Sequence, residues 1–172
     1  ITPSGKKYSS LKVKDIVFVS LDGKYEKKYK PSSEWRFHQD IYIKKKDAQA
    51  LVHTHSTNAT ALSVHKKPIP AFHYMVALAG GNDIKCAKYA TYGTRELSKN
   101  ILKALNNRKA CLIANHGQIA FDKNLPDAFE LAQEVENLSL QYITALKLGK
   151  PKILSINEMN KVLKKAKNYK RG

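Results

Sequence analysis

The segment 50–57 has the sequence ALVHTHST and joins a predicted buried strand to a pair of histidines. Ala50-Leu51-Val52 is a short apolar run that leads directly into His53-Thr54-His55. Because residues two apart on a strand point to the same face, both imidazoles should aim at one point. A zinc ion takes donor atoms at about 2.0–2.3 Å, so this pair could supply two ligands without bending the backbone. The pattern is also common by chance, and alone it does not establish a metal site.

A second buried strand is predicted at 110–114 (ACLIA), and it ends at Asn115-His116-Gly117. His116 therefore stands where a side chain emerges at the rim of a sheet. Residues 118–121 (QIAF) suggest an antiparallel neighbour for this strand. A lone histidine at such a rim is more often hydrogen-bonded than a ligand, but as a third histidine it strengthens the case for a metal.

The chain before these strands contains one further predicted strand and one predicted helix. Residues 16–19 (IVFV) are β-branched and aromatic, and the turn at 21–23 (LDG) closes them as a strand. Residues 31–34 (PSSE) indicate a helix start, with a serine as N-cap and an acidic residue in the first turn. The inner face of this helix is expected to contain Trp35, Ile41 and Tyr42.

Five more helices are predicted from caps, breakers and apolar spacing. Four of them are expected to start at Ser56 or Thr57, at Thr94, at Asp127 and after Ser155. The first should break at 68–70 (PIP), a following helix should break at 80–83 (GGND), and the helix from 127 should end at Gly149. These patterns predict an α/β protein of the α+β type, in which helices flank a central, mostly antiparallel sheet. No repeat or linker divides the chain, so we expect a single domain over 1–172.

The composition excludes some functions and leaves others open. With 31 Lys+Arg against 14 Asp+Glu, the formal net charge is +17, which attracts polyanions. Only four of these cations are arginines, the lysines are scattered in short runs, and no nucleic-acid-binding motif occurs, so specific nucleic-acid binding is not expected. No stretch approaches the about 20 apolar residues of a membrane span. Cys86 and Cys111 stand in or beside apolar runs, which indicates buried thiols and a cytoplasmic protein.

The remaining candidates near the histidines are less informative. Glu34 at a helix start most simply complements the helix dipole. His38, His65 and His73 have no convincing ligand spacing and are interpreted as surface or packing residues.

Beyond these local patterns, the whole chain resembles the zinc-dependent class II aldolase/adducin family, and within it the branch of L-fuculose-phosphate aldolases. Six segments in family order carry the resemblance. They are 1–5 (ITPSG), 31–34 (PSSE), 53–55 (HTH), 69–74 (IPAFHY), 89–94 (YATYGT) and 115–117 (NHG).

The resemblance implies a class II aldolase fold with one zinc ion per chain. His53, His55 and His116 match the family's three histidine ligands. Glu34 matches the residue that serves both as fourth ligand and as the acid/base of proton transfer. The implied reaction is the reversible cleavage of a sugar phosphate, such as L-fuculose 1-phosphate, into dihydroxyacetone phosphate and a short aldehyde.

The resemblance also implies a substrate pocket shared between subunits of a homotetramer. The family's phosphate site is matched by Ser4, Gly5, Ser32 and Ser33. Tyr74 matches a tyrosine that reaches into the neighbouring subunit's site as a proton donor to the aldehyde oxygen. Tyr92 matches an aromatic wall residue, and Tyr169 aligns with a mobile C-terminal tyrosine that closes over substrate.

The sequence departs from the family in one respect. Members carry an N-terminal helix and a Gly-Asn loop that completes the phosphate pocket, and Ile1 falls after that loop. We therefore expect a fragment of a longer chain or a shortened homologue, with zinc binding kept and phosphate affinity reduced.

Three alternatives to the aldolase remain open at this stage. Related epimerases, dehydratases and decarboxylases use the same three-histidine site, although the tyrosines near 74 and 89–94 favour the aldolase. Adducin-like domains keep the fold as interaction modules and need not keep metal ligands. Polyanion binding by charge alone would depend steeply on salt and not on metal. The sequence does not specify which aldehyde is the product, nor whether the metal is zinc, manganese or cobalt.

Overall fold

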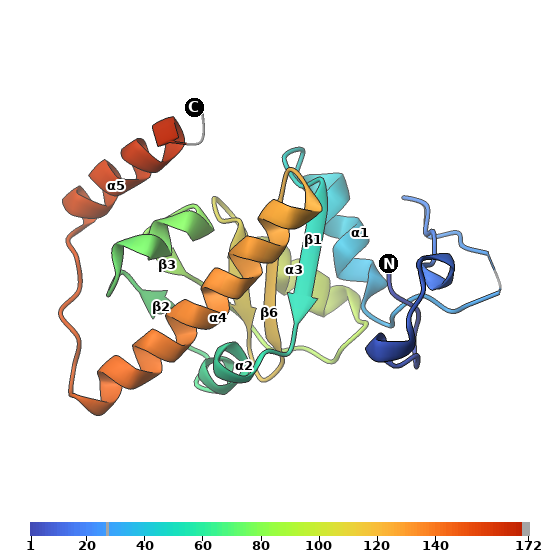
Figure 1. The fold of residues 1–172 in the computed structure, drawn as a ribbon, viewed down its shortest axis with the longest axis horizontal. Helices are drawn as coiled ribbons and strands as arrows, with labels where there is room; N and C mark the ends of the chain where they lie inside the picture. Colours follow the sequence, from blue (N-terminus) through green and yellow to red (C-terminus); the bar gives the residue numbers. More distant parts are fainter. Residues whose placement is uncertain (27, 170–172) are drawn as a thin grey trace.

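The structure is a computed structural model that describes residues 1–26 and 28–169, with side chains described up to residue 166. Its centre is a four-stranded sheet in the order β1-β6-β5-β4 (Figure 1). The strands are β1 (Ala50–Thr54), β4 (Cys86–Ala87), β5 (Ala110–Ile113) and β6 (Gly117–Asp122). A separate antiparallel pair contains β2 (Ile69–Pro70) and β3 (Asp83–Ile84).

The central sheet is mixed, with β6 antiparallel to both β1 and β5 and with β4 parallel to β5. The expected mostly antiparallel sheet is therefore confirmed, with one parallel pairing at the β4 edge. The sequence gives no sign of β4, because two residues are too few to show a periodic pattern.

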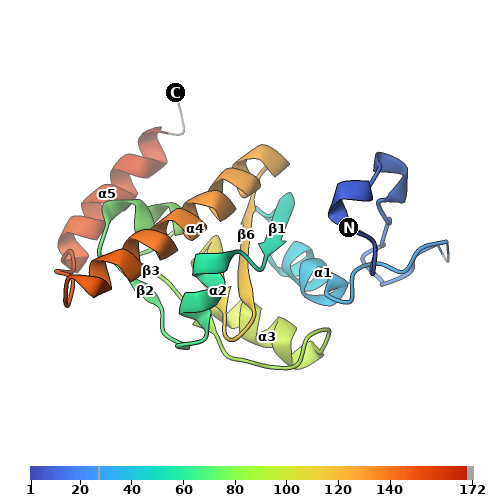
Figure 2. The ribbon, with the colours of Figure 1, turned by 60° about the horizontal axis from the view of Figure 1, so that its bottom comes forward.

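Helices cover both faces of this sheet. They are α1 (Trp35–Lys44), α2 (Thr57–Ser63), α3 (Arg95–Ala104), α4 (Leu125–Lys147) and α5 (Ile156–Tyr169), with short 3₁₀ turns η1 (Tyr8–Ser10), η2 (Val13–Asp15) and η3 (Tyr74–Ala79). Figures 1 and 2 show α4 across one face, with α1 and α3 on the other.

Alternate residues of β5 and β6 pack into two separate hydrophobic cores. Ala110 and Leu112 pack with α2, α4 and η3, whereas Cys111 and Ile113 pack with α1 and α3. Because both faces are covered, β5 is apolar throughout instead of alternating with polar residues.

The helix ends mostly follow the predicted caps. Thr94 accepts a hydrogen bond from Leu97 N at the start of α3, and Ser155 accepts one from Glu158 N at the start of α5. Ser56 is the N-cap residue of α2, although its side chain makes no capping hydrogen bond.

The predicted strand at 16–19 is wrong. Val17 exchanges backbone hydrogen bonds with Ile1, and Val19 forms an isolated bridge with Tyr25, so no continuous ladder forms. Ile16 and Phe18 are 50% and 79% exposed, because no sheet neighbour covers that side. β-branched composition alone does not make a strand when the segment lacks a pairing partner.

Two details of the first helix also differ from expectation. Glu34, and not a serine, is the N-cap residue of α1, and its side chain makes no capping hydrogen bond. The buried face contains Phe37 and Ile41, four residues apart on one side of the helix. Tyr42 is 40% exposed because it lies one residue further round the helix.

The two cysteines are free; Cys111 is fully buried and Cys86 half-buried. Burial raises the pKa of Cys86 to about 11 and that of Cys111 still further. No helix in the described ranges is long and apolar enough to cross a membrane.

Candidate metal centre

Four side chains from distant parts of the chain converge beside the end of β1. One potential ligand atom from each lies within 4.8 Å of the corresponding atom of every other. The residues are Glu34, His53, His55 and His116. The predicted convergence is therefore present in the geometry, and the ring centroids of His53 and His116 are 5.0 Å apart.

The sheet fixes the orientation of His53. His53 Nδ1 lies 2.7 Å from the backbone oxygen of Gln118 on the paired strand β6. A carbonyl oxygen can only accept, so Nδ1 carries a hydrogen and donates it to this oxygen. Nε2 is the atom that faces the cluster, 3.0 Å from His55 Nε2. Metal-binding histidines are commonly oriented by such a bond to a backbone carbonyl.

His116 is positioned by a tight turn between β5 and β6. Asn115 takes a positive φ of 54°, a conformation that asparagine tolerates better than most residues. The His116 backbone N–H bonds to Ile113 O at 3.1 Å and to Ser63 Oγ at 3.3 Å. The turn and the end of α2 thus hold the third histidine opposite the first two.

Glu34 enters the cluster from the start of α1 and is 8% exposed. Its Oε2 lies 2.7 Å from His53 Nε2 and 3.2 Å from His116 Nε2. Burial alone would raise the pKa of this carboxyl, but the His116 and His53 hydrogen bonds outweigh it and hold the pKa below its usual range. Glu34 Oε1 is buried and accepts no hydrogen bond from the described residues.

This donor set fits a divalent metal ion. Three imidazole nitrogens and one carboxylate are ligand types that zinc accepts. Burial, and then the neighbouring His53 and His116, lower the pKa of His55, which favours the neutral imidazole that binds metals. Glu34 Oε1 lies 3.2 Å from His116 Nε2 but accepts no hydrogen bond from the described residues. A buried carboxylate oxygen without a hydrogen bond is costly, and a cation at the centre of the cluster would satisfy it.

The four side chains line one pocket of about 1280 Å³ together with most of the predicted substrate residues. Ser4, Gly5, Ser32 and Ser33 all lie on its wall. Backbone hydrogen bonds from Ser4 N to Lys30 O and from Ser32 N to Thr2 O, both 2.9 Å long, hold these two segments side by side.

Comparison with known proteins gives this site its context. The model of the class II aldolase and adducin N-terminal domain matches residues 1–143. The chain belongs to this family.

Similar proteins include curated aldolases and a solved aldolase structure. The 5-methylthioribulose-1-phosphate/5-deoxyribulose-1-phosphate aldolase of Rhodospirillum rubrum is 52% identical over 169 residues, 98% of this chain and 76% of that protein. The L-fuculose phosphate aldolase of Escherichia coli strain K12 is 50% identical over 170 residues, 98% of this chain and 79% of that one. A solved L-fuculose 1-phosphate aldolase has a TM-score of 0.92 at 42% identity, covering 96% of this chain and 78% of that chain.

Family membership and these relatives establish the fold and the general activity. The chain has the class II aldolase fold and is an aldolase, that is, a lyase. The relatives differ in the sugar phosphate that their names specify.

The three tyrosines of this aldolase fall in different places. Tyr92 lines the pocket and is 67% exposed. Tyr74, at the start of η3, is 53% exposed and does not line the pocket of its own chain. Tyr169 ends α5, and its side chain lies outside the described residues.

Two polar residues near the aldolase site were not identified from the sequence. His38 lines the pocket, and desolvation, followed by the charge of His53, lowers its pKa to about 3. In the sequence, the feature that places His38 near the site is its spacing of four residues, one helical turn, from Glu34. Gln118, 1% exposed, holds His53 through its backbone oxygen, and its amide nitrogen donates to Ser56 Oγ and Ala132 O. Only the β1–β6 register reveals it.

The family's NHG segment has a steric requirement that can be tested. A Cβ at Gly117 would collide with the backbone oxygen of Thr54 and press on His55. We expect Gly117→Ala to cost about 1–3 kcal/mol in urea unfolding and to weaken the binding of any divalent metal ion at the cluster, measured by competition with a chromophoric chelator. Gly149→Ala is the control for metal affinity. Its positive φ of 119° strains an alanine there, but nothing lies within 4 Å of a Cβ and Gly149 does not line the pocket. Equal metal affinity in the two variants would contradict the prediction.

Proposed function

We propose that this aldolase is zinc-dependent and cleaves a ketose 1-phosphate, similar to L-fuculose 1-phosphate, into dihydroxyacetone phosphate and a short aldehyde. The observation that supports this most is the shared pocket of the Glu34–histidine cluster and the two serine segments. A metal centre and an anion-binding wall are the two parts that this substrate needs. The names of the relatives agree, since each specifies a phosphorylated sugar aldolase.

Within this proposal, Glu34, His53, His55 and His116 hold the zinc ion. A bound zinc ion supplies Lewis-acid stabilisation of the negative charge that develops when the carbon–carbon bond breaks. Manganese and cobalt accept similar ligands, so the support for zinc is the family resemblance together with the three imidazoles.

The phosphate group would bind where Ser4, Gly5, Ser32 and Ser33 meet. The serine hydroxyls, together with the backbone N–H groups of Gly5 and Ser33, suit a dianion. Gly5 has a positive φ of 73° with no atom within 4 Å of a Cβ, so the wall at this point is open backbone. Binding the phosphate here holds the reacting carbons beside the histidine cluster.

Two side chains would move protons. Glu34 Oε1, which accepts no described hydrogen bond, would transfer a proton between solvent and the carbon left behind by the aldehyde. Tyr74 of a neighbouring subunit would exchange a proton with the aldehyde oxygen. Support for this second role is the exposure of Tyr74 and its absence from its own chain's pocket wall. We accordingly propose a homotetramer with interface sites. Tyr169 is proposed to close over substrate, Tyr92 to form an aromatic wall, and the cytoplasm to be the compartment.

Metal removal and a substrate panel test this proposal together. Dihydroxyacetone phosphate release should be measured with L-fuculose 1-phosphate, 5-deoxyribulose 1-phosphate and 5-methylthioribulose 1-phosphate. A chelator should abolish release, and zinc should restore it. His116→Ala should lower zinc affinity by at least about 100-fold, because a three-ligand remnant binds poorly. His65→Ala, at an exposed position off the pocket, should change neither zinc affinity nor rate.

Other products would change the conclusion. An epimeric sugar phosphate, a dehydrated product or carbon dioxide would instead indicate the related epimerase, dehydratase or decarboxylase chemistry. Full activity in the metal-free protein would contradict the zinc centre. Binding of polyanions that depends on salt and not on zinc, without turnover of any sugar phosphate, would favour an interaction module.

A further inference from the structure

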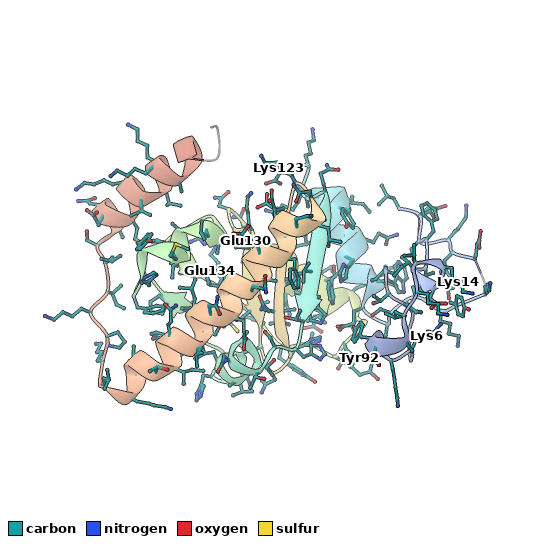
Figure 3. The ribbon with its side chains drawn as sticks, viewed as in Figure 1. Lys6, Lys14, Tyr92, Lys123, Glu130 and Glu134 are labelled. Atoms are coloured by element: carbon teal, nitrogen blue, oxygen red, sulfur yellow. The ribbon has the colours of Figure 1, made fainter. Side chains whose placement is uncertain are left out.

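Lys6 follows the Ser4-Gly5 segment and lies on the wall of the same pocket. Among the described residues that line this pocket, it is the only lysine or arginine, although the chain carries 31 such cations. Its side chain is 33% exposed. Figure 3 places Lys6 and Tyr92 on the N-terminal side of the molecule, where Tyr92 also lines the pocket.

A buried carboxylate holds the Lys6 ammonium in place. Asp15 is 1% exposed, and its Oδ2 lies 2.7 Å from Lys6 Nζ and 2.8 Å from Lys12 N. The ammonium also lies 5.5 Å from the ring centroid of Tyr29. Asp15 itself does not line the pocket, so an anion that enters would meet the ammonium and not the carboxylate.

The ammonium retains donors for a ligand. A lysine has three N–H donors, and Asp15 accepts from one of them. The described residues offer Lys6 Nζ no second hydrogen bond. A charge-assisted bond to a phosphate oxygen is stronger than a bond from a neutral hydroxyl. An ion pair at the wall is therefore pre-positioned to receive an anion next to the two serine segments.

We propose that Lys6, held by Asp15, is a binding residue for the phosphate group of the substrate and selects phosphate monoesters over uncharged sugars. This inference rests on the proposed function. Lys6 adds a full positive charge to the pocket wall that is formed by Ser4, Gly5, Ser32 and Ser33. Because the phosphate is remote from the bond that breaks, Lys6 acts mainly on binding and little on the chemical step.

The test compares Lys6→Met with Lys14→Met. Lys14 is the matched control, because it neighbours Asp15 in sequence and loses the same charge, but it is exposed and does not line the pocket. Lys6→Met should raise KM for the ketose 1-phosphate by roughly 10- to 100-fold, with kcat within about 3-fold of the unmutated protein. Competitive inhibition by inorganic phosphate should weaken by a similar factor. Lys14→Met should change each value by less than about 2-fold.

Loss of the Lys6 charge leaves Asp15 buried without its cation, so a second variant separates folding from binding. The double variant Lys6→Met, Asp15→Asn removes both charges. If its unfolding midpoint is near that of the unmutated protein and its KM remains raised, the binding role is supported. If the double variant recovers normal KM and phosphate inhibition, Lys6 only neutralises Asp15 and the proposal is overturned.

The outcomes also separate this inference from the proposed function. Equal KM and phosphate inhibition in the Lys6 and Lys14 variants, with normal cleavage, overturn the role of Lys6 alone. Absence of cleavage of every sugar phosphate overturns the proposed function. In that case equilibrium dialysis with inorganic phosphate decides the role of Lys6. Weaker phosphate binding by Lys6→Met than by Lys14→Met supports it, and equal binding contradicts it.

Discussion

Replacing Glu34 by glutamine should slow proton exchange at dihydroxyacetone phosphate by about 10²–10⁴-fold while leaving the fold and zinc content intact. Glutamine keeps the shape and one oxygen donor, but it cannot accept a proton. Glu34 Oε2 contacts the His53 and His116 rings. Glu34 Oε1 is buried and accepts no hydrogen bond from the described residues, so it is available to accept a proton. The measurement is deuterium incorporation from heavy water, followed by NMR.

Two other roles for Glu34 predict different results. If it only complements the dipole of α1, the variant should lose about 0.3–1 kcal/mol of stability and keep exchange. The Glu34 side chain makes no capping hydrogen bond at the start of α1, which is evidence against that role. If it is only a ligand, zinc affinity and exchange should fall together and excess zinc should rescue both. Glu96→Gln, an exposed first-turn acid of α3, is the control. Normal exchange in zinc-loaded Glu34→Gln would refute the acid/base role.

Mixing two inactive variants should restore activity if the active site spans two subunits. Tyr74→Phe lacks the proposed proton donor, and His53→Ala lacks a proposed metal ligand. Tyr74 is exposed and lies off its own pocket wall, in η3, which packs with α4 and α5 (Figure 1). In a cyclic tetramer formed from equal amounts, about one quarter of the sites would pair an intact His53 with an intact Tyr74. The expected result is therefore up to about one quarter of the unmutated activity.

The control for this experiment mixes His53→Ala with His116→Ala. Both defects fall in the same cluster, whose residues come from one chain, so no hybrid site can be complete. Recovery in the control would indicate exchange of metal or residual activity and would invalidate the assay. In hybrids verified by mass spectrometry, absence of recovery with the Tyr74 variant would show that Tyr74 does not complete a neighbour's site.

Local sequence patterns were enough to predict the helices and strands that have strong signals within a few residues. The apolar run before His53 and the run before His116 became β1 and β5, because burial on both faces of a sheet requires such runs. Alternation along β1 and into the residue that follows it placed His53 and His55 on one side, with Nε2 atoms 3.0 Å apart. Strong caps at Thr94 and Ser155 set the starts of α3 and α5. Each of these outcomes depends on neighbours within a few residues.

The tertiary structure alone decided what depends on pairing between distant segments. The 16–19 segment has strand composition but no partner beyond isolated pairings, so it stays irregular. Local patterns indicate only a helix-dipole role for Glu34, and its part in the cluster came from the family resemblance; the fold brings its Oε2 within 2.7 Å of His53 Nε2. The same holds for Gln118, whose backbone oxygen the β1–β6 pairing brings to His53 Nδ1, and for Lys6, which Asp15 holds at the pocket. Such contacts depend on the register of the sheet and on close packing across it, and local sequence patterns do not contain that information.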